Sequence, residues 1–158
     1  MDETTARIIE RITRRYDTPV TLPNGEESSI FFDCLDLNPG ELARLSAQAI
    51  GHLSDDAFDF AVGIAYSGIF FAAAVAGGKN VGILQHDGAL CGPRVDGRRV
   101  VVVDDVICTA QRVTRASSLI EEAGGHVIGY CCIVDRTSQS QSSIGKPIWS
   151  AYQVSLRS

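Results

Sequence analysis

Four consecutive valines, Val100–Val103, restrict the possible fold of this chain more than any other feature of its sequence. Successive side chains of a β-strand point to opposite faces, so an unbroken apolar run predicts a strand that is buried on both faces. Such strands lie at the centre of largely parallel sheets that carry helices on both sides. Apolar residues at helical spacing follow from Val113 to Ala123, which predicts a helix after this strand. The pattern therefore indicates an α/β fold.

Asp104 and Asp105 come directly after the valines. In open α/β sheets ligands bind at the carboxyl ends of the strands, where the next helix N-terminus offers free N–H groups to an anion. Burial and mutual repulsion make two neighbouring carboxylates costly there, so these acids are the main candidates for a functional site. The alternatives are helix-capping acids that reach solvent and the phosphoacceptor acids of a receiver domain. A receiver domain would carry its acid pair after the first strand and a lysine after a later one, and neither condition holds here.

Elsewhere apolar spacing and the Gly, Pro and Asn positions predict alternating helices and strands in a single domain, residues 1–158. Residues 1–36 are expected to form a helix and a hairpin hood, and residues 37–158 the core of a doubly wound, mostly parallel sheet. The predicted helices span residues 4–16, 39–53, 67–76 and 109–123. The predicted strands span residues 59–64, 81–84, 99–103, 126–134 and about 148–155, with a hairpin turn at Pro23-Asn24-Gly25 and a mobile polar loop from Ser138 to Gly145.

The composition argues against several classes of protein. Hydrophobic residues make up 45% of the chain, but the longest apolar stretch, Ile69–Gly77, is far shorter than the ~20 residues of a membrane span. The net charge of −5 disfavours a nucleic-acid partner. The N-terminus lacks a secretory signal and the five cysteines lack zinc-site spacing, so we expect reduced thiols in a cytoplasmic protein. Only two of the fourteen Lys and Arg residues are lysines, Lys79 and Lys146.

The segment Asp104-Asp105-Val106-Ile107 resembles the phosphate loop of the type I phosphoribosyltransferases, in which a strand runs into Asp-Asp-Val-hydrophobic and then Thr-x-Gly-x-Thr. The resemblance implies that Asp104 and Asp105 hold the ribose hydroxyls during catalysis. It also implies that the next five residues cradle a 5′-phosphate: Cys108, Thr109, Ala110, Gln111 and Arg112. These five differ from the usual Thr-Ala-Gly-Thr-Ala. Ala110 in place of glycine would make a left-handed backbone angle costly there, and Arg112 is either a compensating charge or a solvated helix residue.

Three further segments are similar to the orotate phosphoribosyltransferase family, so that the resemblance covers roughly residues 1–137. Val20–Asp33 resembles its N-terminal hairpin, Phe60–Ile69 its pyrophosphate loop, and Ile133–Arg136 the strand end that places an arginine on the orotate carboxylate. The resemblance implies diphosphate binding by Ala65, Tyr66, Ser67 and Gly68 and base binding by Phe31, Phe32 and Arg136. It also implies magnesium that arrives with phosphoribosyl diphosphate and has no direct protein ligand.

The chain departs from that family where lysines are expected. Pro23 and Ser67 replace lysines of the hairpin and the pyrophosphate loop, and residues 85–98 are a short lysine-free segment in place of a long mobile loop. His86 is either a remnant of a histidine in that loop or incidental. Arg94, Arg98 or Arg99 are candidates to replace the missing cations. Cys108, close to a helix N-terminus, would be a nucleophile only with a base that the sequence does not name.

Three functional hypotheses follow. In the first, the chain is a magnesium-dependent, orotate-type phosphoribosyltransferase of pyrimidine biosynthesis. In the second, it binds a nucleotide or an orotate-like ligand without transfer, as a sensor or a subunit. The third is another glycosidic-bond reaction on the same fold. Each hypothesis predicts a small-molecule ligand and no membrane partner. The apolar helix 67–76 and the hairpin further predict a homodimer.

Overall fold

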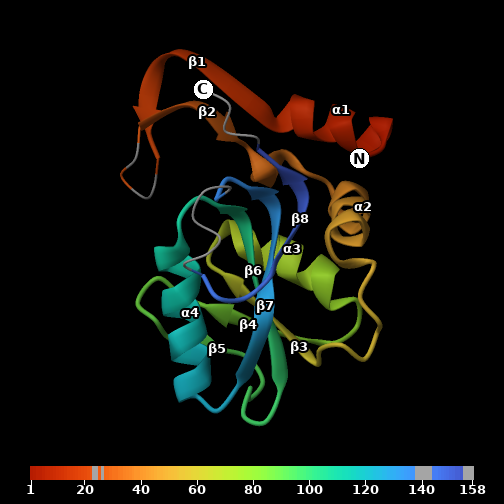
Figure 1. The fold of residues 1–158 in the computed structure, drawn as a ribbon, viewed down its shortest axis with the longest axis vertical. Coiled ribbons are helices and arrows are strands. Elements are labelled where there is room, and N and C mark those ends of the chain that lie inside the picture. The colour runs from red at the N-terminus through yellow and green to blue at the C-terminus, as the bar shows by residue number, and fades with distance from the viewer. Residues whose placement is uncertain (23–24, 26, 138–143, 155–158) are drawn as a thin grey trace.

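The computed structural model describes residues 1–22, 25, 27–137 and 144–154, and its centre is a six-stranded sheet (Figure 1). The strands lie in the order β5 (Leu90–Cys91), β4 (Asn80–Leu84), β3 (Phe60–Ile64), β6 (Arg99–Ile107), β7 (His126–Asp135) and β8 (Ile148–Gln153). Neighbouring strands pair in parallel except β4 and β5, which are antiparallel. The predicted α/β class with a mostly parallel sheet is confirmed.

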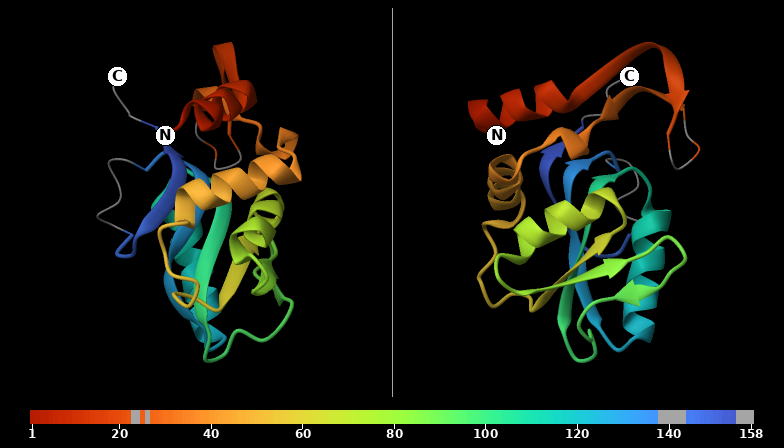
Figure 2. Two further views of the ribbon diagram at one scale, coloured as in Figure 1. Left: turned by 90° about the vertical axis from the view of Figure 1, so that its right-hand side faces the viewer. Right: turned by 180° about the vertical axis from the view of Figure 1, so that it is seen from behind.

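Helices cover both faces of this sheet (Figure 2). α2 (Pro39–Ile50) and α3 (Ser67–Ala76) pack on one face, and α4 (Ala110–Glu122) packs on the other. The four valines of β6 divide between these layers: Val101 and Val103 lie in the core beneath α2 and α3, whereas Val100 and Val102 lie in the core beneath α4. All four are fully buried, as their unbroken run predicts.

A hood stands over the carboxyl edge of the sheet. It consists of α1 (Glu3–Ile12) and an antiparallel hairpin of β1 (Thr13–Thr21) and β2 (Glu27–Phe32), and the short η1 (Cys34–Asp36) leads from it into the core. The predicted helix 4–16 is too long. It ends at Ile12 because residues 13–15 pair with residues 30–32 of β2, which places Tyr16 on an exposed strand instead of on the helix.

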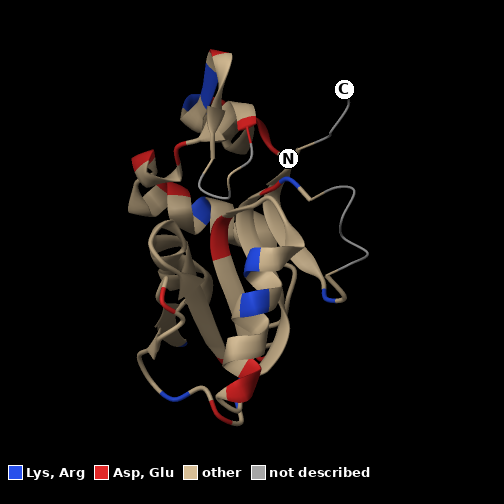
Figure 3. Ribbon diagram, turned by 90° about the vertical axis from the view of Figure 1, so that its left-hand side faces the viewer, with Lys and Arg blue, Asp and Glu red and all other residues tan. Residues whose placement is uncertain are grey.

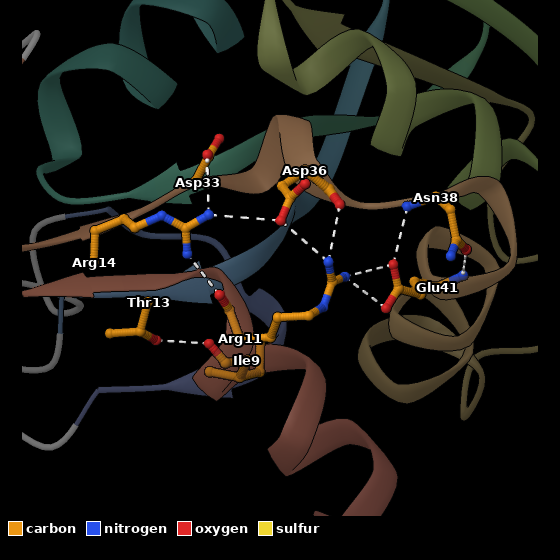
Figure 4. Close-up of polar contacts among 8 residues, drawn as sticks. All are labelled: Ile9, Arg11, Thr13, Arg14, Asp33, Asp36, Asn38 and Glu41. Carbon is orange, nitrogen blue, oxygen red and sulfur yellow. Dashed lines mark hydrogen bonds and ion pairs between the residues drawn. The ribbon is translucent and has the colours of Figure 1, made fainter.

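A polar network joins this hood to the core, as Figure 4 shows. The Arg11 guanidinium donates to both carboxylate oxygens of Glu41 on α2, at 2.6 and 2.7 Å, and to Asp36 of η1 at 3.1 Å. Arg14 of β1 donates to Asp33 at 3.3 Å. Glu41 also completes the capping box of α2 with the N-cap residue Asn38. Although exposed ion pairs are individually weak, this network fixes how the hood enters the core.

Other element boundaries also differ from the predicted ones, and strand pairing explains the differences at β5 and β6. β6 continues through the acids to Ile107 because its last residues pair with Val134 and Asp135 of β7. The short β5 pairs with the end of β4 inside the predicted loop 85–98. α2 ends at Ile50, three residues early, whereas α3 ends where predicted, before the left-handed Gly77 (φ 57°). The predicted turn residues Pro23 and Asn24, the loop residues 138–143 and the predicted strand end at residue 155 lie outside the described residues.

Within the described part of the chain, no helix is both long and apolar enough to cross a membrane.

Candidate functional site

A cavity of about 300 Å³ lies between the hood and the carboxyl ends of β3, β4, β6 and β7. It is lined by Leu22, Phe31, Phe32, Asp33, Cys34, Leu35, Ala65, Tyr66, Ser67, His86, Asp104, Asp105, Val106, Ile107, Cys108, Thr109, Arg112, Val113 and Arg136. The structure thus brings all four sequence-predicted segments to one site. Three predicted residues, Gly68, Ala110 and Gln111, do not line it.

Asp104 lies at the floor of this cavity and is only 1% exposed. Its Oδ1 accepts the Asp105 N–H at 2.9 Å, while its buried Oδ2 has no hydrogen-bond partner among the described residues. Burial raises the pKa of Asp104 well above its usual range, and the Asp105 charge adds to this rise, whereas Arg112 opposes it. The acidic end of β6 is red in Figure 3, beneath the hood. Asp104 is therefore an acceptor, or at lower pH an acid, that faces a ligand cavity.

Asp105 is half-buried beside it, and its Oδ1 accepts the Val106 N–H at 2.8 Å. Both acids thus accept the backbone N–H of the following residue, and this fixes the course of the chain at the end of the strand. The pair is part of β6 and not of a helix cap, because α4 begins only at Ala110. The capping alternative is therefore wrong.

The predicted phosphate loop leads into the first turn of α4. Thr109 is the extended N-cap residue, with φ −131°, and no side chain caps the helix there. The first N–H groups of a helix have no intrahelical partner, so they can bind an anion. Ala110 is the first helical residue, and no non-glycine residue in the described ranges has a positive φ. The expected cost of replacing glycine by Ala110 does not arise in this structure.

Arg112 faces the site from this first turn. One guanidinium nitrogen lies 3.6 Å from Asp104 Oδ2, and the other donates to the Ala65 carbonyl oxygen at 3.2 Å. Its side chain remains 44% exposed. Arg112 thus joins the predicted phosphate loop to the predicted diphosphate loop and is not merely a solvated helix residue.

The other candidate arginines lie elsewhere. Arg99 begins β6, five residues before Asp104, which separates their Cα atoms by about 16 Å along the strand. Its side chain pairs with Asp59 at 2.9 Å, and Arg94 pairs with Asp96 at 3.0 Å. Arg98 directly precedes Arg99. None of these three arginines is among the described residues that line the cavity, so this structure does not place them where the missing cations are expected.

The Ala65–Gly68 loop approaches the acids closely. A Cβ atom on Gly68 would lie 2.8 Å from the Val103 carbonyl oxygen and 3.1 Å from the Asp104 Cα, so only glycine allows this packing of α3. Tyr66 is 72% exposed, and its ring lies edge-on to His86 with the ring centroids 4.9 Å apart. His86 therefore belongs to the cavity wall. Its position in the sequence had not decided whether it lies at the site.

The opposite end of the cavity is formed by the hood and by Arg136 at the end of β7. Arg136 donates to Ser28 Oγ at 3.1 Å and to the Ile30 carbonyl oxygen at 3.3 Å, and its guanidinium lies 5.8 Å from the Phe32 ring centroid. Phe32 is 5% exposed and belongs mainly to the core, whereas Phe31 is 36% exposed. A planar ligand therefore has more access to Phe31 than to Phe32.

Sequence reasoning missed much of the apolar wall. Leu22, Cys34, Leu35, Ile107 and Val113 line the cavity, although the sequence did not single them out as ligand contacts. The only sequence signal was their position within or next to the hairpin segment and the segment that carries the acids. All five cysteines are described and none forms a disulfide, and burial raises the pKa of the Cys34 thiol. No group of three His, Cys, Asp or Glu residues in the described ranges is arranged to hold a metal ion.

Comparisons with known proteins find relatives in sequence and in fold. Residues 80–148 match the model of the phosphoribosyl transferase domain. The chain is 32% identical over 143 residues to the orotate phosphoribosyltransferase of Halorhodospira halophila, covering 78% of this chain and 66% of that protein. It is 34% identical over 140 residues to the enzyme of that name from Nitrosococcus oceani, covering 77% and 63%. The chain thus spans slightly less than two thirds of the length of these relatives.

Solved structures show the same fold. Orotate phosphoribosyltransferase from Aeropyrum pernix superposes with a TM-score of 0.78 at 22% identity, covering 94% of this chain and 93% of that one. The Mycobacterium tuberculosis orotate phosphoribosyltransferase in complex with 5-phospho-α-D-ribosyl 1-diphosphate gives a TM-score of 0.72 at 20% identity, covering 95% and 94%.

Proposed function

Because this chain belongs to the type I phosphoribosyltransferase family, we propose that its cavity binds a pyrimidine nucleotide and its precursors for an orotate-type phosphoribosyl transfer. One observation carries the proposal. An acid pair, a helix N-terminus and two arginines converge on a single cavity whose remaining wall is largely apolar. Arg112 and Arg136 are the cations among the described lining residues, one near the helix N-terminus and the other beside the hood. This arrangement suits a planar molecule with an anionic group at each end.

In the proposed reaction, a ring nitrogen of the base attacks C1′ of phosphoribosyl diphosphate. The new N–C1′ bond forms as the bond from C1′ to the diphosphate oxygen breaks, and diphosphate leaves with the electron pair. The proton of the ring nitrogen passes to the departing diphosphate or to water. Asp104 and Asp105 would accept hydrogen bonds from the ribose hydroxyls and stabilise the positive charge that develops on the sugar. The N–H groups at the start of α4 would hold the 5′-phosphate, and Arg136 would hold the carboxylate of the base.

Magnesium fits this site only as a companion of the diphosphate. The unpartnered Asp104 Oδ2 offers one oxygen, but the described residues contain no set of three protein ligands. Magnesium that arrives with the diphosphate would neutralise the charge of the leaving group. The residues of this chain would orient the ribose.

The absence of lysine from the described cavity lining favours a second candidate function, binding without transfer. Ser67 stands where a lysine of the pyrophosphate loop is expected, and no other described cation replaces it on that loop. A nucleotide with a single phosphate would still have the contacts proposed above for its ribose, its 5′-phosphate and its base. The chain would then act as a sensor or a subunit.

Calorimetric titration tests both candidate functions. The ligands are phosphoribosyl diphosphate, orotate and orotidine monophosphate, each with and without magnesium. We expect orotidine monophosphate to bind and Arg136→Gln to weaken its binding, while Asp55→Asn, a change on an exposed loop, leaves the affinity unchanged. A parallel assay of diphosphate release separates the transferase from the binding protein. Failure of orotidine monophosphate and orotate to bind under all conditions would reject the proposed function.

A further inference from the structure

Arg136 connects two parts of the molecule that lie far apart in the sequence. It follows β7 at the carboxyl edge of the sheet and donates two hydrogen bonds to β2 of the hood, one to Ser28 Oγ at 3.1 Å and one to the Ile30 carbonyl oxygen at 3.3 Å. Its backbone is fixed on the sheet, because its N–H donates to the Ile107 carbonyl oxygen at 2.8 Å. The orientation of the guanidinium, by contrast, depends on the hood.

The Ser28 hydroxyl is the centre of this contact. It donates to the Ile30 carbonyl oxygen at 2.9 Å and accepts the Ile30 N–H at 3.1 Å, in addition to the bond from Arg136. These bonds use the donor and both acceptor positions of a hydroxyl, so its orientation is fixed. They also bridge the place where the pairing of β1 with β2 is interrupted. Ser28 thus joins the backbone of the hood to the charged end of Arg136.

The same strand covers the cavity. Phe31 follows Ile30 directly and lines the cavity, as Arg136 does, whereas Ser28 is half-buried behind the lining. If β2 moved away from the sheet, Phe31 would leave the ligand and the guanidinium would lose both bonds that orient it. A long side chain without these bonds would have to be ordered by the ligand itself, at a cost in conformational entropy. The position of the hood and the orientation of the guanidinium are therefore linked.

We propose that Ser28 is a positioning residue for Arg136 and makes the recognition of a carboxylate depend on a closed hood. The guanidinium has further N–H groups besides the two that bond to β2, and these can bind a carboxylate. A base that carries a carboxylate is then bound and covered at the same time, whereas a base without one gains nothing from the contact between Ser28 and Arg136. This inference rests on the proposed function in assigning the carboxylate of the base to Arg136.

The test compares orotidine monophosphate with uridine monophosphate, which lacks the carboxylate and is otherwise identical, by calorimetry on the full chain. Ser28→Ala should weaken binding of orotidine monophosphate about tenfold, the scale of one hydrogen bond to a charged group, and change binding of uridine monophosphate by less than about twofold. A role of Ser28 in the hairpin alone would instead weaken both nucleotides equally. Ser28→Thr keeps the hydroxyl and should restore the preference for the carboxylate.

Ser29→Ala is the matched control, because Ser29 is the exposed neighbour of Ser28 on the same strand, and both affinities should stay unchanged. A double-mutant cycle tests whether Ser28 acts through Arg136: in an Arg136→Gln background, Ser28→Ala should cost no further affinity for orotidine monophosphate. Thermal midpoints show whether the variants remain folded. If Ser28→Ala does not fold, Arg136→Lys approaches the contact from the other side, because it keeps the charge but loses the two-pronged bond to β2, and it should lose the same preference.

Hydrogen exchange of the β2 amides measures the hood directly. Orotidine monophosphate should slow this exchange more than uridine monophosphate does in the wild-type protein, and the difference should disappear in Ser28→Ala. Equal protection by the two nucleotides, equal weakening of both in Ser28→Ala, or additive losses with Arg136→Gln would each overturn the inference.

The inference and the proposed function can fail separately. If orotidine monophosphate binds through Arg136 while Ser28→Ala keeps the wild-type preference over uridine monophosphate, the proposed function stands and the role of Ser28 fails. If the wild-type protein binds the two nucleotides equally, nucleotide binding stands and the inference fails with the carboxylate contact. If neither nucleotide binds, both fail.

Discussion

The buried carboxyl group of Asp104 lowers the stability of the free protein and leaves one acceptor available to a ligand. Val103 precedes it in the fully buried run, so the strand carries its carboxyl group into the interior. There its Oδ2 finds no hydrogen-bond partner among the described residues. A buried polar atom without a partner costs about 1–3 kcal/mol, and a ligand hydroxyl would remove that cost. The same atom therefore weakens the free protein and favours the complex.

The raised pKa of Asp104 predicts how the stability of the protein depends on pH. A folded-state pKa above the unfolded value contributes stability below the unfolded pKa, and this contribution is lost as pH rises through the raised folded pKa. Asp104→Asn removes the buried charge and should stabilise the protein by about 1–2 kcal/mol near pH 8. The gain should shrink toward about pH 4, where the wild-type carboxyl group is protonated in the folded protein. Urea denaturation across this range measures it. A gain that does not vary with pH would contradict the assignment.

Asp105 is predicted to matter for activity more than for stability, since it is half-buried and its carboxylate can reach both solvent and ligand. If the chain catalyses transfer, Asp105→Asn should lower the turnover number by at least about 100-fold, the scale of one positioned group that stabilises charge in a transition state. Steady-state release of diphosphate measures the change. Turnover within a few-fold of wild type would remove Asp105 from the ribose site.

At the scale of elements, the close approach of α3 to β3 and β6 shapes the site. Gly63 and Gly68 let this helix lie directly on the two strands, since a Cβ atom at either position would meet backbone or helix atoms at 2.8–2.9 Å. The contact brings the Ala65–Gly68 loop against Asp104. The geometry of the predicted diphosphate loop is therefore set by two residues that need not touch a ligand.

Gly68→Ala should destabilise the protein by about 1–3 kcal/mol, because the added methyl group meets the rigid Val103 carbonyl and pushes α3 outward. It should also weaken binding of orotidine monophosphate, since the Asp104 Cα lies next to the same position. Chemical denaturation and calorimetry measure the two effects. Gly40→Ala is the control: its methyl group meets nothing closer than 3.4 Å at an exposed helical position, so stability should stay equal or rise. Equal behaviour of the two variants would contradict the packing argument.

At the scale of the whole molecule, charge determines which ligands the cavity prefers. The chain carries a net charge of −5, and Arg112 and Arg136 are the cations among the described residues of the cavity wall. We expect orotidine monophosphate to bind at least about tenfold, or 1.4 kcal/mol, more tightly than phosphoribosyl diphosphate, because the acidic protein disfavours the more highly charged ligand. Calorimetry without magnesium gives both constants. Tighter binding of phosphoribosyl diphosphate than of orotidine monophosphate would mean that cationic side chains other than Arg112 and Arg136 bind the diphosphate.

The distribution of apolar surface predicts that two copies associate. Leu35, Tyr66 and Phe70 are large apolar residues that are 64%, 72% and 61% exposed, and two of them flank the mouth of the cavity. Exposed apolar groups of this size on a small domain commonly mark an interface. We expect a dimer by light scattering at micromolar concentration, and a shift toward monomer in Phe70→Glu. A monomeric wild-type protein would contradict this expectation.

The sequence alone determined the features that depend on local periodicity. The valines of β6 predicted a strand buried on both faces, and the structure divides them between the two cores. The acids at the end of that run, the N-cap of α2 and the end of α3 at Gly77 follow equally from neighbouring residues. Side-chain alternation, capping and turn chemistry act over a few residues, so the sequence contains them directly.

Only the tertiary structure decided which distant groups meet. Arg112 and Arg99 are both arginines close to β6 in sequence, yet one faces Asp104 and the other pairs with Asp59 at the opposite edge of the sheet. Likewise, pairing with β2 ended α1 at Ile12 and made Phe32 a core residue while Phe31 stayed accessible. The physical reason is that a parallel sheet gathers the carboxyl ends of strands far apart in the chain. Which charges converge there depends on strand order and packing rather than on neighbouring residues.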